Sequence, residues 1–210
     1  MDGALPGERA SRTMTKIKAL SVIQCRDYVL EFYGPEGLER IKAAMPPAAC
    51  AAIYSDELLP TDWVEVGYAV DHGRCIDRVF GIGDGQECFR MINELTTRHA
   101  AGLYKSVLTG GSSRSILERA GRLWPRYYDQ GETLVEMVGD TACIKRIVGC
   151  PDLPRYHDWF TTPYYETLLR HSGAKDISVK HTKCVANGAD CCETELRWKP
   201  DRSSHFPFDL

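Results

Sequence analysis

The spacing of apolar residues changes in the middle of the chain, and this change limits the fold more than any other feature. Before Gly131 the apolar residues recur at helical intervals, whereas "ETLVEMVGDTACIKRIVG", residues 132–149, alternates between apolar and polar residues. Gly139-Asp140 divides this run, which is a good signal for a β-hairpin. A helical run and a second hairpin run around Asn187-Gly188 follow. This order predicts an α+β fold, in which a helical N-terminal half packs on a small antiparallel sheet built from two hairpins.

Start and stop residues divide the helical runs. Pro35 suits the first turn of a second short helix, and Thr61 is expected to be the N-cap of a long amphipathic helix with Trp63 on its apolar side. Ser112 or Ser113 is expected to cap a further helix, which Pro125 should kink or end. Pro163 lies inside the last helical run and predicts a kinked or two-part helix there.

The length and composition fit one domain with extensions. The chain has 210 residues, of which 43% are hydrophobic and 26% charged, which is enough to build a substantial core. We expect a disordered lead over residues 1–14, a single α+β domain of ligand-binding type over 15–199, and a flexible tail over 200–210. Met14 is an alternative start.

Charge and hydropathy exclude several classes of partner. The net charge of −3 argues against nucleic acid as a bulk electrostatic partner. The chain contains no apolar run of the ~18 residues that a membrane span needs, and its first residues lack the order of a signal peptide. The nine cysteines are therefore expected to be reduced thiols in a cytoplasmic protein rather than a disulfide framework.

Three of these cysteines flank the turn of the second hairpin run. If the loop is Asn187-Gly188-Ala189, Cys184 and Cys192 face each other across the hairpin, close enough to share a tetrahedral metal ion. Cys191 then points to the opposite face. A metal site, buried structural thiols and, least favoured, a redox pair remain open as interpretations.

Further ligands for a metal at this hairpin would have to come from other positions. In a regular strand the odd spacing would put His181 on the face opposite Cys184, so its participation requires a β-bulge or a strand end. His157 and Cys150 lie upstream and could approach from the preceding helix and hairpin.

The segment "HTKCVANGADCCETELRW", residues 181–198, resembles the closing hairpin of 4-vinyl-reductase-type domains. The similarity is greatest to a family of uncharacterised myxobacterial proteins of about this length. The resemblance covers residues 15–199, since further segments fit that family in the same order: "FYGPEGLERI", "MPP", "LLPTDWVEV", "RLWPRYYDQGE" and "HSGAKDISVKHTKC". The wider superfamily includes haem-based nitric-oxide sensors, Golgi-tethering small subunits and aromatic-sensing domains of bacterial transcription regulators.

The resemblance implies an α+β fold with a ligand pocket between helices and sheet, often in a homodimer. In the aromatic-sensing members, cysteines and an acidic residue hold a structural zinc near this hairpin. Carried over by position, the two hairpin cysteines fall on Cys184 and Cys192, the acidic ligand on His181, and the remaining cysteine near His157. The resemblance thus implies a structural zinc site of cysteine and histidine ligands, a set that zinc accepts.

The same resemblance makes haem an unlikely cofactor. The nitric-oxide sensors carry a Tyr-x-Ser-x-Arg motif against the haem propionates, whereas "YKSVL", starting at Tyr104, has Leu108 in place of the arginine. His72 and His99 lie on amphipathic helical runs, where single histidines are more often exposed or core-edge residues than ligands.

Aromatic residues with polar tips gather in two segments and are candidates for lining a pocket, although for any single one of them a place in the helix–sheet core is the more common outcome. The candidate ligand-binding residues are Trp124, Tyr127, Tyr128, Trp159 and Phe160.

The sequence favours a cytoplasmic sensory module over an enzyme. It contains no phosphate-binding loop, nucleophile elbow or HExxH motif. We expect it to bind a small apolar or aromatic molecule and to signal through a protein partner or a homodimer, without nucleic acid. The alternative is a non-catalytic tethering or adaptor subunit with a filled core, and a thiol-dependent enzyme or a haem-based gas sensor comes third.

Overall fold

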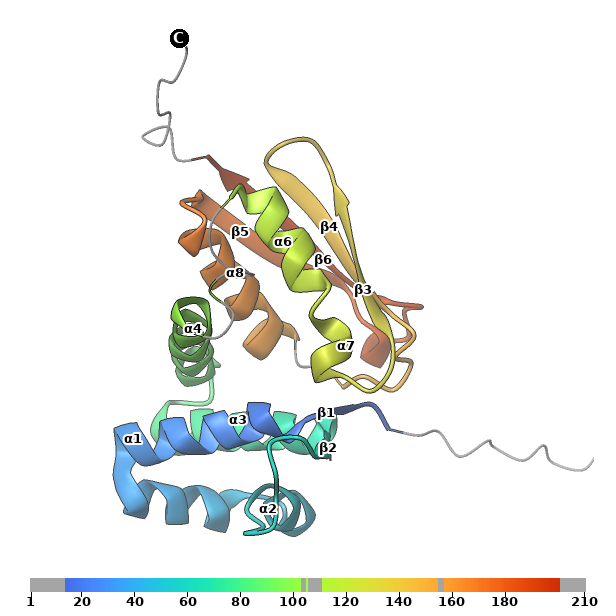
Figure 1. Ribbon diagram of the computed structural model, residues 1–210. Coiled ribbons are helices and arrows are strands. Elements are labelled where there is room, and N and C mark those ends of the chain that lie inside the picture. Colours follow the sequence, from blue (N-terminus) through green and yellow to red (C-terminus); the bar gives the residue numbers. More distant parts are fainter. Residues whose placement is uncertain (1–13, 103–104, 106–110, 155–156, 201–210) are drawn as a thin grey trace, which may run out of the picture.

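The computed structural model describes residues 14–102, 105, 111–154 and 157–200, without the side chains of residues 157 and 158. It has the α+β architecture that the periodicity predicts: a helical N-terminal half and a C-terminal half in which helices pack on an antiparallel sheet (Figure 1). The domain boundaries stay a prediction, because residues 1–13 and 201–210 lie outside the described part.

The N-terminal half is a layer of helices with a short two-stranded sheet at one end. Its elements are β1 (Lys16–Lys18), α1 (Ala19–Ala44), α2 (Pro47–Ile53), β2 (Trp63–Glu65), α3 (Val66–Phe80) and α4 (Gln86–Ala101). Gly34 interrupts α1 with φ 69° and ψ −176°, so Pro35 begins a second helical segment, as predicted. The buried Asp77 carboxylate accepts the N–H groups of Gly85 and Glu87 at 2.8 and 2.9 Å and caps the start of α4.

The prediction of a helix capped at Thr61 is wrong. Residues Trp63–Glu65 form β2, which pairs antiparallel with β1, and α3 begins only at Val66. The Ala19 N–H donates to the Asp62 carbonyl at 2.9 Å, which extends the contact between the two segments. Pairing with a strand far away in the sequence thus replaces the first turn that the local pattern suggested.

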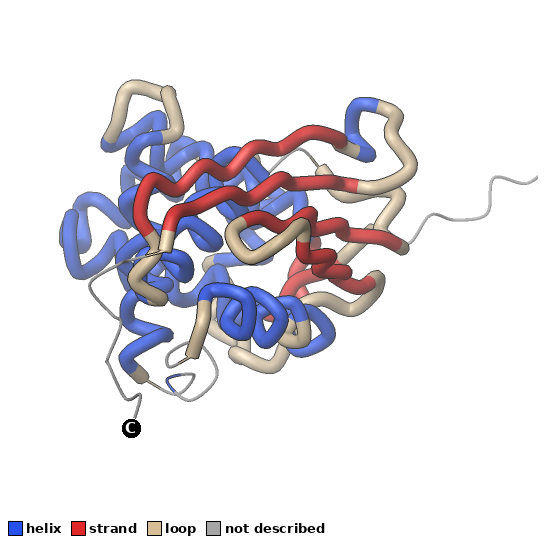
Figure 2. Tube along the Cα trace, turned by 90° about the horizontal axis from the view of Figure 1, so that it is seen from above, coloured by secondary structure: helices blue, strands red, loops and turns tan. Residues whose placement is uncertain are grey.

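The C-terminal half carries the main sheet. Its elements are α6 (Ser113–Gly121), α7 (Trp124–Tyr127), β3 (Glu132–Met137), β4 (Ala142–Val148), η1 (His157–Thr161), α8 (Thr162–His171), β5 (Lys175–Lys183), η2 (Val185–Asn187) and β6 (Cys192–Lys199). The two predicted hairpins are present and join through β4 and β6 in the order β3-β4-β6-β5. Figure 2 shows strands side by side in a sheet, with helices packed next to it. Ser112 caps α6, as one of the two serines was expected to do. The two-part helix around Pro163 consists of the π-helix η1 followed by α8.

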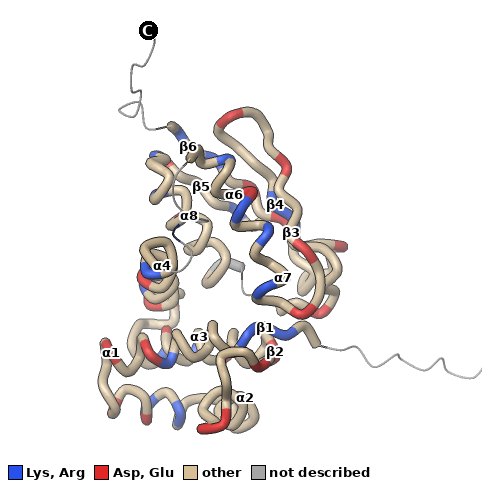
Figure 3. Tube along the Cα trace, viewed as in Figure 1, with Lys and Arg blue, Asp and Glu red and all other residues tan. Residues whose placement is uncertain are grey.

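The sheet has a charged face and a buried face. On the charged face Arg146 bridges Glu136 of β3 and Glu193 of β6 at 2.7 and 2.8 Å, and Figure 3 shows charges of both signs along these strands. On the buried face Cys143, Lys145 and Ile147 of β4 point toward the helices.

Two further findings concern the cysteines and the helix lengths. Each of the nine cysteines, all within the described part, is a free thiol. Among the described residues no helix is long and apolar enough to cross a bilayer.

Candidate functional site

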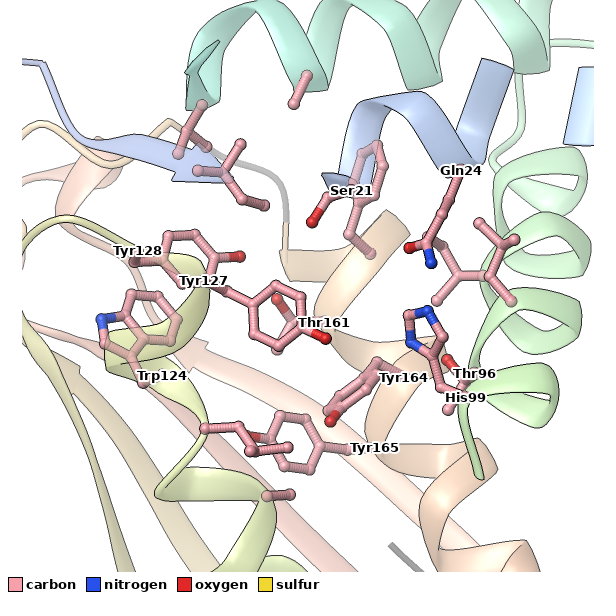
Figure 4. A pocket seen from close by; sticks show the side chains of 18 of the residues that line it. Ser21, Gln24, Thr96, His99, Trp124, Tyr127, Tyr128, Thr161, Tyr164 and Tyr165 are labelled. Carbon is pink, nitrogen blue, oxygen red and sulfur yellow. The ribbon is translucent and has the colours of Figure 1, made fainter. Parts of the chain in front are cut away.

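A cavity of about 200 Å³ lies between the helical layer and the buried face of the sheet. Its walls come from α1, α3 and α4 on one side and from α7, η1, α8, β3 and β4 on the other. Most of the wall is aliphatic or aromatic, and polar tips such as those of Ser21, Gln24 and Thr161 reach it from different elements (Figure 4). A concave, mostly apolar cavity with a few converging polar groups is the usual form of a small-molecule site.

Aromatic residues form one wall of this cavity. The rings of Trp124 and Tyr128 stack with centroids 3.7 Å apart, and Tyr164 and Tyr165 meet edge to face at 5.1 Å. The Trp124 indole donates to the Gln130 carbonyl at 3.0 Å, which fixes the orientation of its ring. The wall is therefore held by contacts of its own and does not depend on a ligand for its shape.

Four of the five candidate ligand-binding residues line this cavity: Trp124, Tyr127, Tyr128 and Phe160. Trp159 is not among the lining residues. It packs against Gly85 at the start of α4, where a Cβ would lie 3.3 Å from the Trp159 Nε1 atom. Tyr164 and Tyr165, which belong to the same aromatic-rich helical run as Trp159 and Phe160, also line the cavity. A ligand-binding role stays a prediction for all of them.

The position of Phe160 depends on Gly73 of α3. A Cβ at Gly73 would lie 2.1 Å from the Phe160 Cζ atom, so the absence of a side chain at this position lets the ring approach the helix. Phe160 also lines the cavity, and anything that displaces its ring changes the shape of the cavity.

We expect Gly73→Ala to lower the free energy of unfolding by roughly 1–3 kcal/mol, the usual cost of overpacking a core. Gly67→Ala is the matched control on the same helix, because a Cβ there meets no atom within 4 Å. The control should be neutral or stabilising by up to about 1 kcal/mol. Urea unfolding of both variants measures the difference, and equal stabilities would contradict the role assigned to Gly73.

Among the described residues that line the cavity, Lys145 alone has a long cationic side chain. It is 2% exposed, and its Nζ lies 4.5 Å from the centroid of the Tyr165 ring. Burial lowers the pKa of Lys145 from its usual value to about 7. Its neighbour Arg146 pairs with two glutamates on the other face, whereas Lys145 has no hydrogen bond or ion pair within the described part of the chain.

His99 reaches the cavity from α4 (Figure 4). Burial lowers the pKa of His99, which favours the neutral imidazole, the form in which histidine binds metals. His72 takes no part in the cavity. It is buried in the helical layer, where its Nε2 lies 2.9 Å from the Tyr54 hydroxyl.

Next to the cavity, the second hairpin brings three potential metal ligands together. The donor atoms of His181, Cys184 and Cys192 all lie within 4.8 Å of one another. Zinc binds sulfur at about 2.3 Å and nitrogen at about 2.0–2.1 Å. A small shortening of the distances between the three donor atoms would therefore place all of them around one ion. Cys184 and Cys192 belong to the same buried cluster as Trp124 and Val70, which line the cavity.

A β-bulge allows His181 to join this cluster. His181 pairs with Thr194 but Lys183 pairs with Glu193, so β5 advances two residues where β6 advances one. The extra residue changes the alternation of side chains, and Cys184 comes to the same face as His181. This is the irregularity that the sequence spacing required.

Cys184 itself is not paired in the ladder as the simple hairpin predicted. It follows the end of β5 and precedes η2, and the Val185 N–H donates to the Cys192 sulfur at 3.4 Å. Burial, followed by the neighbouring Cys184, raises the pKa of Cys192 to about 12. Without a metal ion the thiol therefore keeps its proton.

The remaining candidates for this cluster lie elsewhere or outside the described part. Cys150 donates its S–H to the Gln130 carbonyl at 3.3 Å and is not in the cluster. Cys191 is buried but also separate from it. The side chain of His157 and the residues Tyr104 and Leu108 lie outside the described residues.

The fold and cavity define an α+β protein with a concave, mostly apolar site between helices and sheet. Solved structures that it resembles include several H-NOX proteins. No family model matches the chain, and no curated protein matches it. An H-NOX protein from S. oneidensis in the Fe(II)NO ligation state has a TM-score of 0.63 at 12% identity, over 87% of this chain and 99% of that chain. An oxygen-binding H-NOX domain related to soluble guanylate cyclases has a TM-score of 0.60 at 9% identity, over 88% and 96%. The chain thus has the H-NOX fold.

These comparisons correct the expectation that haem is unlikely. A third structure with the same fold, from a study of heme distortion in the H-NOX family, has a TM-score of 0.62 at 10% identity, over 87% of this chain and 95% of that chain. The expectation had relied on a missing Tyr-x-Ser-x-Arg motif and on single histidines being ordinary surface or core residues. His99, one of those histidines, instead lines the cavity.

Proposed function

We propose that this protein is a non-catalytic sensory module that binds a small apolar or aromatic molecule in the cavity between its helices and its sheet. The observation that carries the proposal is the cavity itself, an aromatic site of about 200 Å³ walled by both halves of the chain. An engineered cavity of about 150 Å³ holds benzene, so a molecule of one or two rings matches the available space. The alternative of an adaptor subunit with a filled core is less well supported, because this core is not filled.

A change of ligand occupancy could reach a partner through the two halves of the chain. The ligand would touch α1, α3 and α4 on one side and α8 and β4 on the other. Its binding would therefore favour one position of the helical layer relative to the sheet over others. We propose that a protein partner or a second copy of the chain reads this difference. The resemblance to 4-vinyl-reductase-type domains and to the myxobacterial family supports such a role.

A thermal-shift screen with one- and two-ring aromatic compounds tests the proposal, because a molecule that binds only the native state must raise its apparent stability. Compounds that raise the melting temperature of the wild type should no longer do so in Ala120→Phe, which would place a ring in the cavity wall. Ala174→Phe is a control at a buried position outside that wall. Failure of the whole panel to stabilise the protein would contradict the proposal.

A haem-based gas sensor is the second candidate, and His99 is the observation that favours it. Histidine is a common axial ligand of haem iron, and the neutral His99 ring lines the cavity. His99 would hold the iron, Tyr164 and Tyr165 would pack beside the macrocycle, and the bound haem would supply the capacity to bind a diatomic gas. The side chains that narrow the cavity would have to turn outward to admit the group.

Reconstitution with haem separates the two candidates. A haem sensor should give a stoichiometric complex with a sharp Soret band, which His99→Ala abolishes or shifts. His171→Ala, on an exposed residue, should leave the band unchanged. Weak, nonstoichiometric absorbance that is insensitive to His99→Ala would contradict haem binding and leave the first candidate standing.

We also propose that His181, Cys184 and Cys192 bind a structural zinc ion. Their clustered donor atoms and the bulge that brings His181 to the same face support this proposal. The ion would tie the end of β5 to the start of β6, beside the cavity wall that contains Trp124. Zinc would then stabilise the site without contacting the ligand.

A further inference from the structure

No described residue with a negative charge pairs with the ammonium group of Lys145. The residue is 2% exposed, and lysines are almost never this deeply buried unless they are paired. Within the described part of the chain its ammonium group meets the Tyr165 ring but no carboxylate. The residues that pair with it across the sheet are Val135 on β3 and Thr194 on β6, and neither carries a charge.

The same wall has a second polar group without a partner. The Thr133 hydroxyl is buried and makes no hydrogen bond to any described residue, although Thr133 lines the cavity next to Lys145. Thr133 pairs with Ile147, two residues from Lys145, and the two side chains are diagonal neighbours on one face of the sheet. An unmade hydrogen bond at a buried group costs free energy, so two such groups side by side indicate a site built for a polar part of a ligand.

We propose that the ligand of this cavity is an aromatic carboxylic acid, whose carboxylate pairs with the Lys145 ammonium and accepts a hydrogen bond from Thr133. The inference rests on the proposed function and specifies its ligand class. A singly charged anion matches Lys145, the one lysine or arginine among the described lining residues, whereas a phosphate group would bring a second negative charge that no described lining residue pairs with. The Tyr164 and Tyr165 rings and the aliphatic lining would enclose the apolar body of the acid.

Matched acids and amides test this inference. Phenylacetate and 2-naphthylacetate are compared with phenylacetamide and 2-naphthylacetamide by isothermal titration calorimetry on the full chain. Each acid should bind roughly 30-fold or more tightly than its amide, the range expected for a fully buried charge pair. Lys145→Met should remove this preference and leave amide affinity nearly unchanged. Lys180→Met, the same change at an exposed position of β5, should have no effect.

The outcomes separate the inference from the function on which it rests. Equal binding of acids and amides to the wild-type protein would overturn the carboxylate inference and support the apolar site. Preference for acids that survives Lys145→Met would overturn the role of Lys145. Binding of neither series would overturn both the inference and the aromatic-ligand function. The comparison of acid with amide on the wild-type protein remains decisive even if Lys145→Met does not fold.

Discussion

Cys184→Ser is expected to abolish stoichiometric zinc binding and to lower the melting temperature by roughly 8–16 °C. A ligand present at about 1,000 times its Kd stabilises the native state by about 4 kcal/mol, and 1 kcal/mol corresponds to about 2–4 °C for a chain of this size. The loss follows because Cys184 is one of the three clustered donors, and the remaining two cannot hold the ion tightly. Metal analysis of protein purified without chelator, together with calorimetric melting, measures both effects.

Chelator and a matched variant separate metal loss from loss of packing. Cys143→Ser makes the same change at a buried cysteine outside the cluster. Its stability difference from the wild type should be the same with and without EDTA, whereas that of Cys184→Ser should shrink strongly in EDTA. Cys191→Ser should keep its zinc. Wild-type protein that carries no stoichiometric zinc would contradict the proposed site.

Acid is expected to weaken the fold through His72. Burial, followed by the charge of Arg26, lowers the pKa of His72 from 6.5 to about 3. Above pH 6.5 the ring is neutral in both the folded and the unfolded state and contributes nothing to pH dependence. As the pH falls from 6.5 towards 3, the unfolded chain binds a proton that the folded protein cannot, which costs about 1.4 kcal/mol per pH unit. The total loss is roughly 4–5 kcal/mol.

Urea unfolding between pH 4 and pH 7 measures this loss. His72→Gln keeps an acceptor for the Tyr54 hydroxyl but cannot be protonated, so its stability should depend less steeply on pH than that of the wild type. The acidic residues contribute equally to both proteins and cancel in the comparison. His171→Gln, at an exposed position, should leave the wild-type slope unchanged. Identical slopes for the wild type and His72→Gln would contradict the prediction.

Local patterns in the sequence were sufficient for the hairpins and most helices. The alternation around Gly139 and Asn187 and the cap at Ser112 depend on neighbouring residues, so a single sequence contains the information. The strand at Trp63–Glu65 was missed because it exists only through pairing with Lys16–Lys18, which no local pattern reveals. The joining of the two hairpins through β4 and β6 is equally non-local.

Only part of the candidate site could be predicted from the sequence, because the rest depends on contacts between distant segments. The bulge at His181 could be stated as a requirement of the spacing, but only the structure shows that it is present. Lys145 was overlooked, although its alternation with Cys143 and Ile147 already put a lysine on the apolar face of its strand. Which aromatic residues line the cavity depends on the packing of α8 and η1 against α4, and this is why Trp159 and Phe160, adjacent in sequence, have different surroundings.

The division of the cavity wall between the two halves of the chain has a consequence for folding. Residues before position 103 supply one side and residues after position 110 supply the other, so each half alone would present only an open apolar surface. A bound molecule that touches both sides acts as a non-covalent cross-link between two parts of one polymer. Its binding free energy then adds to their mutual affinity, and two separately produced fragments should associate more tightly in its presence.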